Sequence, residues 1–79
     1  MNKEDQEHKQ FLEQQLQWCK KRDRILEEIE MKLHEMKKIV QYTLDYELTE
    51  IELEQLNDRL KELTGEVYSL ERQLHTVVH

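Results

Sequence analysis

An unbroken apolar stripe runs through the last third of the chain. Its eight residues recur alternately three and four positions apart: Leu53, Leu56, Leu60, Leu63, Val67, Leu70, Leu74 and Val77. This heptad spacing is typical of a helix that buries a narrow seam against another helix. The pattern therefore predicts a helix over about residues 50–77 that needs a helical partner.

A second, wider apolar stripe at helical spacing runs from Phe11 to Leu44, with Ile25 and Ile39 on its flank. A stripe wider than one seam suits a helix that contacts two neighbours, as in a bundle. We expect this helix over about residues 9–45, after a frayed polar end at residues 1–8. The residues predicted to line a hairpin or dimer seam are the eight named above and, on this helix, Leu26, Ile29, Leu33, Met36 and Val40.

Start signals for the later helix coincide at Thr49. Thr49 and Glu52 have the spacing of a capping box, and Leu48 and Leu53 have that of a hydrophobic staple. These signals predict a turn at about residues 45–49, which would place residue i of the first helix opposite about residue 94 − i. The alternative is one continuous helix of roughly 115 Å in a parallel coiled-coil dimer.

Composition supports an all-α fold in a single domain over residues 9–79. The chain has 79 residues, 38% of them charged, with one glycine and no proline. Such a composition is typical of long helices or coiled coils, and so small a chain often gains stability by oligomerisation. We therefore expect an antiparallel helical hairpin that forms a homodimer, either a four-helix bundle or a coiled coil.

Charge and cysteine content indicate a soluble cytoplasmic protein. The formal net charge is −6, which disfavours a nucleic-acid partner. The single cysteine, Cys19, fits a reducing compartment. The polar start of the chain does not resemble a signal peptide, and no apolar run approaches the roughly 20 residues that span a membrane.

The apolar residues Phe11, Leu12, Leu16 and Trp18, with Cys19 beside them, form a candidate partner patch. Phe11 and Trp18 are seven residues apart and so share a helix face, and tryptophan is enriched at interaction hot spots. The functional interpretation is a docking patch for another protein. The structural interpretation is coverage by the dimer mate or by the end of the second helix.

A basic cluster, Lys20 to Arg24, offers an alternative function. Such a cluster could attach the protein to nucleic acid or to an anionic membrane surface if its charges share one face. Glu27, Glu28 and Glu30 follow closely, which favours a solvated helix face with ion pairs between neighbouring turns.

Residues for chemistry are scarce. His75 and His79 have the four-residue spacing of metal ligands, but Glu71 is the only nearby candidate for a third ligand. No glycine-rich loop, activated nucleophile or inward carboxylate cluster appears. We therefore expect no metal, no cofactor and no catalysis, and interpret the protein as a structural or regulatory protein–protein interaction module.

Overall fold

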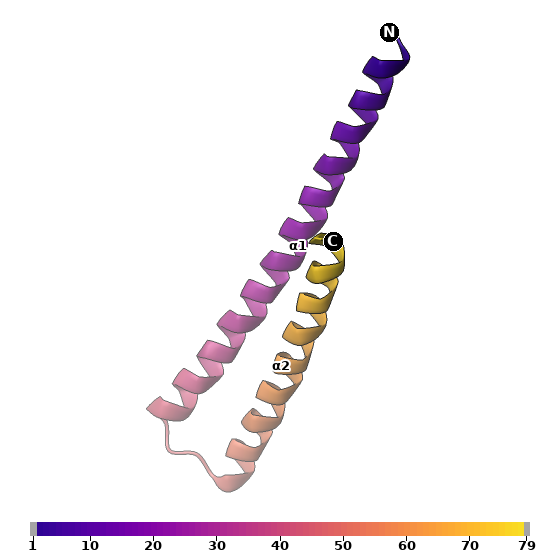
Figure 1. Cartoon of the computed structure of the whole chain (residues 1–79). Coiled ribbons are helices and arrows are strands. Elements are labelled where there is room, and N and C mark those ends of the chain that lie inside the picture. The colour runs from indigo at the N-terminus through magenta and orange to yellow at the C-terminus, as the bar shows by residue number, and fades with distance from the viewer. Residues whose placement is uncertain (1, 79) are drawn as a thin grey trace.

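The computed structural model of the chain describes residues 2–78, with only the backbone described for Val78. It has two helices, α1 (Lys3–Asp45) and α2 (Glu50–Val78), which lie side by side in opposite directions (Figure 1). The predicted all-α helical hairpin is confirmed, and the alternative of one continuous helix is wrong.

The turn lies at residues 46–49, as the capping signals predicted. The Thr49 hydroxyl accepts a hydrogen bond from the Glu52 backbone N–H at 3.1 Å and donates one to the Glu52 carboxylate at 3.0 Å. In the usual capping box the glutamate instead accepts from the N-cap backbone N–H, so this cap is a variant of that motif. Glu50 and Glu52 also place negative charge at the positive end of the α2 dipole.

The first helix begins six residues earlier than the pattern predicted. The Asn2 side chain accepts a hydrogen bond from the Asp5 backbone N–H at 2.9 Å, and Glu4 and Asp5 lie in the first turn. An asparagine cap and first-turn carboxylates stabilise a helix start without any tertiary contact. The apolar pattern could not reveal this start because residues 3–8 face only solvent; their fraying in solution stays a prediction.

The core begins near the middle of the hairpin and lies in the half farther from the turn. Ile25 and Ile29 of α1 pack against Val67 and Leu70 of α2. Leu63 has an exposed fraction of 0%, and the α2 seam continues through Leu74 and Val77. The α2 helix runs straight through Gly65, where an added Cβ would meet nothing within 4 Å.

The hairpin seam of α1 differs from the predicted one. Ile25 is 6% exposed, whereas Leu26, Leu33 and Val40 are between 44% and 50% exposed and therefore do not lie in the hairpin seam. The shielded residues that recur every three or four positions are Trp18, Arg22, Ile25, Ile29, Lys32, Met36, Ile39 and Thr43, and Cys19 and Glu35 beside this stripe are also partly shielded.

The reason for this difference is that two stripes overlap on α1. Both include Ile29 and Met36, so apolar spacing alone could not distinguish them. When the shielded stripe faces α2, Lys32 lies close to Glu66 and the neighbouring Glu35 lies close to Arg59. The wide stripe was expected to contact two neighbours, and α2 covers only one side of it.

The two helices differ in length, so the hairpin is an elongated rod of 70 × 18 × 12 Å. The N-terminal part of α1 extends beyond the end of α2 (Figure 1). We call residues 3–17 the arm; all of its side chains are exposed.

The fully buried Leu63 provides a test of the seam. Leu63→Ala should lower the free energy of unfolding by about 2–5 kcal/mol, because it leaves a cavity between the helices. Chemical denaturation at a fixed protein concentration measures this loss. The exposed Tyr68 is the matched control, and Tyr68→Ala should have little effect. A loss below about 1 kcal/mol for Leu63→Ala would mean that the seam is not packed there.

Candidate interaction surfaces

One side of the hairpin presents an apolar flank on α1. It consists of Leu26, Leu33 and Val40, which are seven residues apart and about half exposed. The same seven-residue spacing continues toward the arm through Cys19 and Leu12. Residues seven apart stay on one side of a helix, so the flank is a continuous stripe beside the hairpin seam.

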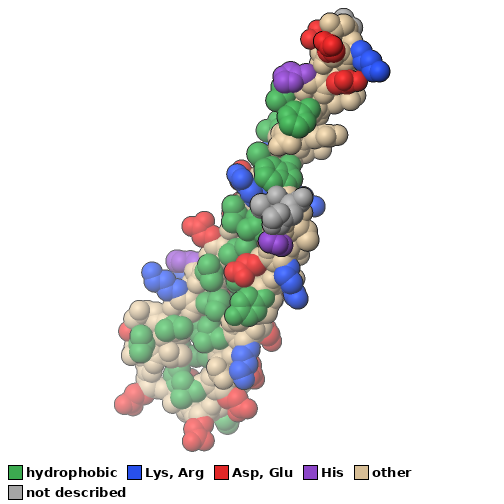
Figure 2. Space-filling view, in the orientation of Figure 1, with side chains coloured by type: hydrophobic (Ala, Val, Ile, Leu, Met, Phe, Trp, Pro, Cys, Tyr) green, Lys and Arg blue, Asp and Glu red, His purple; other side chains and the backbone are tan. Residues whose placement is uncertain are grey.

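The arm carries the second exposed apolar surface. Phe11, Leu12 and Leu16 are between 52% and 56% exposed. Figure 2 shows hydrophobic side chains at the surface of this projecting part and again toward the turn. Three large apolar residues in one short segment exceed the scattered single residues that are normal on a protein surface.

Trp18, the fourth residue of the predicted patch, lies in the hairpin seam instead. Its indole N–H donates a hydrogen bond to the Val77 carbonyl near the end of α2. The Arg22 guanidinium lies over its ring, 5.5 Å from the centroid, which is a cation–π geometry. For Trp18, therefore, the structure favours coverage by the second helix, and the exposed part of the patch is Phe11, Leu12 and Leu16.

The opposite side of the seam is closed by ion pairs between the helices. Arg59 of α2 donates to Glu35 of α1, with the nearest Nη2–Oε1 distance at 3.0 Å. Lys32 Nζ lies 2.8 Å from Glu66 Oε2. On α1, Glu35 and the flank leucines are on opposite sides of the seam. One side of the hairpin is therefore charged and paired, and the other is apolar and open.

These ion pairs shift two pKa values. Hydrogen bonds from Arg59 to Glu35 and Glu62 raise the pKa of the guanidinium, so it stays charged at any ordinary pH. The hydrogen bond from Lys32 lowers the pKa of Glu66 below its ordinary value of 4.5. Partial exposure keeps each contribution small, so the pairs fix the relative position of the helices more than they add stability.

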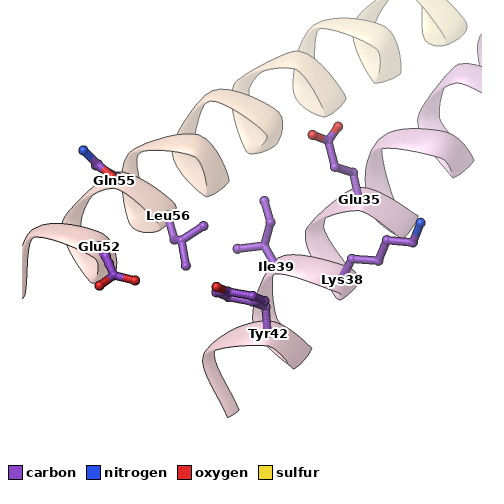
Figure 3. A pocket seen from close by; sticks show the side chains of 7 residues that line it. All are labelled: Glu35, Lys38, Ile39, Tyr42, Glu52, Gln55 and Leu56. Atoms are coloured by element: carbon purple, nitrogen blue, oxygen red, sulfur yellow. The ribbon is translucent and has the colours of Figure 1, made fainter. Parts of the chain in front are cut away.

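The helices separate toward the turn and leave open grooves. On the charged side, Ile39, Tyr42 and Leu56 line a groove of about 420 Å³ with Glu35 and Lys38 at its rim (Figure 3). On the flank side, a groove of about 450 Å³ is lined by Thr43, Leu53, Glu54, Leu56, Asn57 and Leu60. The lining of both grooves includes neither serine, cysteine nor histidine.

The basic cluster is divided between two sides of α1. Lys20 and Lys21 lie four and three residues before Arg24, so these three exposed residues are neighbours on the outer side of the helix. Arg22 turns toward the seam and Trp18, and its Nη2 lies 3.7 Å from Asp23. The alternative function through this cluster stays a prediction; it would be supported by binding that is lost between low and moderate salt.

The described residues offer no other site of chemistry. Among residues 2–78, no three potential metal ligands gather closely enough to hold an ion. His79, half of the predicted histidine pair, lies outside the described residues. Within the same range, neither helix has an apolar stretch long enough to cross a membrane. No family model, curated protein or solved structure matches the chain.

Sequence reasoning missed the ion pairs between the helices. A usable signal was present, because the predicted register of about 94 − i places Arg59 opposite Glu35, as observed. The register did not indicate Lys32 with Glu66, since their numbers sum to 98 and the long lysine side chain spans the difference.

The lowered pKa of Glu66 predicts a pH dependence of stability. A carboxylate with a lowered pKa stabilises the fold above its ordinary value, 4.5, and loses this contribution as the pH falls through the lowered value. Wild type should thus be more stable than Glu66→Gln at neutral pH, and the difference should shrink in acid below pH 4.5. Urea denaturation at a series of pH values measures the difference in unfolding free energy between the two proteins. The control is Glu71→Gln at an exposed position, and a difference independent of pH would contradict the ion pair.

Proposed function

We propose that the protein is a non-enzymatic protein–protein interaction module that acts through its helix faces. The observation that carries the proposal is the amount of large apolar surface that the hairpin leaves exposed on α1, in the flank and in the arm. Water disfavours such surface, and contiguous exposed patches of this kind mark interaction sites.

Self-association is the first part of the proposal. A two-helix hairpin encloses a small core, here five buried side chains among the residues that the structure describes. Two hairpins that pack together would cover the flank and produce a four-helix bundle, the usual solution for helices of this length. A homodimer uses the same surface twice, so a single apolar flank is sufficient.

Binding of a different protein through the arm is the second part. A dimer that covers the flank still leaves Phe11, Leu12 and Leu16 available. An amphipathic helix that projects from a rigid base can enter an apolar groove of another protein, with anchors three to four residues apart. The spacing of Leu12 and Leu16 fits this mode of recognition.

Sedimentation tests the self-association. The wild-type chain should sediment as a folded dimer at micromolar concentration, and its thermal midpoint should rise with protein concentration because dimerisation stabilises the folded state by mass action. A folded monomer with a concentration-independent midpoint would contradict this part of the proposal.

A matched pair of variants tests the arm. Leu12→Asp removes an apolar anchor, whereas Gln10→Asp adds the same charge to the same exposed helix. We expect Leu12→Asp to reduce capture of a cellular partner by tenfold or more, because burying one leucine side chain contributes about 1.5–3 kcal/mol. Gln10→Asp should retain capture, and both variants should keep the helical content measured by circular dichroism. Equal capture by all three proteins would exclude the arm as the binding surface.

A further inference from the structure

The protein exposes more surface than a chain of its size normally does. Its accessible surface is 6920 Å² for a mass of 9.8 kDa. A folded monomer of this mass is expected to expose about 5,200 Å². The excess of roughly 1,700 Å² per chain exceeds the roughly 800 Å² that each partner buries in a stable interface. A second copy of this chain is therefore a sufficient cover for the exposed surface.

The two sides of the hairpin are not equally suited to receive this second copy. Burying the charged side would require dehydration of Arg59, Glu35, Lys32 and Glu66, which already pair within the chain. The flank side instead offers Leu26, Leu33 and Val40, and next to them the open groove lined by Leu53 and Leu60. A second copy on the apolar flank thus buries exposed aliphatic side chains without dehydrating these ion pairs.

Charge along the edge of the flank decides the direction of the second copy. Glu30 and Lys37 follow Leu26 and Leu33 by four residues, and so border the flank on the same edge. A parallel dimer would place Glu30 beside Glu30 and Lys37 beside Lys37 of the two copies. An antiparallel dimer with its two-fold axis beside Leu33 places each Glu30 near Lys37 of the other copy.

A two-fold axis beside Leu33 also brings the two ends of the flank, Leu26 and Val40, into contact between the copies. Around an axis at Leu33, Leu26 of one copy meets Val40 of the other and reaches the groove beside it. An axis at Leu26 would instead bring Asp23 near Glu30 and the acidic turn near Glu4, Asp5 and Glu7, so like charges would meet.

We infer that a second copy of this chain packs antiparallel on the apolar flank, with the two-fold axis beside Leu33. This inference rests on the proposed self-association and specifies its surface, direction and register. Leu33 packs on Leu33, Leu26 packs on Val40, and Glu30 pairs with Lys37 in both symmetry-related places. The arms then extend past the turn of the opposite copy at the two ends of the bundle.

Single cysteines crosslinked with a short bismaleimide test this register in a Cys19→Ser background. Leu33→Cys should crosslink two chains efficiently because it lies on the axis. Leu26→Cys and Val40→Cys should each fail alone, since like positions are then separated by about 21 Å along the helix, but the double variant should crosslink. Met31→Cys, an exposed residue near the axis but on the far face of α1, is the matched control and should not crosslink.

Any other crosslinking result would contradict one part of the proposal, either the register or the choice of face. Crosslinking of Leu26→Cys alone or Val40→Cys alone would overturn the antiparallel register at Leu33. Efficient crosslinking of Met31→Cys, or a dimer by sedimentation in which Leu33→Cys stays uncrosslinked, would overturn the choice of face. None of these crosslinking results would contradict self-association itself. A folded wild-type monomer in sedimentation would contradict both the self-association and the proposed dimer.

Charge exchange provides an independent readout of direction. Glu30→Lys or Lys37→Glu alone should raise the dimer dissociation constant by roughly threefold to tenfold, because two symmetry-related pairs are lost. Combining both substitutions should restore it, since the pairs re-form with exchanged signs. Additive weakening in the double variant would overturn the pairing of Glu30 with Lys37.

Discussion

The structure depends on how α1 divides its apolar residues between two faces. A helix can bury only part of its circumference against one neighbour, and α1 carries apolar residues over a wider arc than α2 can cover. Ile25 and Ile29 face Val67 and Leu70, so Leu26 and Leu33 necessarily turn away from the seam. The same geometry that closes the hairpin therefore creates its exposed flank.

The seam of α1 also contains polar residues. Lys32 and Thr43 occupy positions on α1 that face α2, where an ideal hairpin would carry aliphatic residues. The lysine stem can cover apolar surface while its ammonium group reaches Glu66 at the edge. Polar residues at seam positions weaken packing but specify register, which matters when two stripes overlap.

The sequence was sufficient to predict the two helices and the turn, because heptad spacing and the cap at Thr49 are local signals. It was also sufficient for the register, since a short turn fixes which residues face each other. The seam of α1 could not be predicted, because Ile29 and Met36 belong to both candidate stripes and the choice depends on partners across the hairpin. For Trp18 the sequence left two interpretations open, and its hydrogen bond to Val77 favours coverage by the end of the second helix.

The arm has a thermodynamic character different from that of the rest of α1. Its backbone hydrogen bonds are helical, but no described tertiary contact buries its side chains, so its order depends on helix propensity and on the Asn2 cap. The chain should therefore have a gradient of local stability, highest near Ile29 and lowest at the N-terminus. A protein that binds the arm must also hold it helical, so residues that never touch that protein, Asn2 among them, contribute to the affinity.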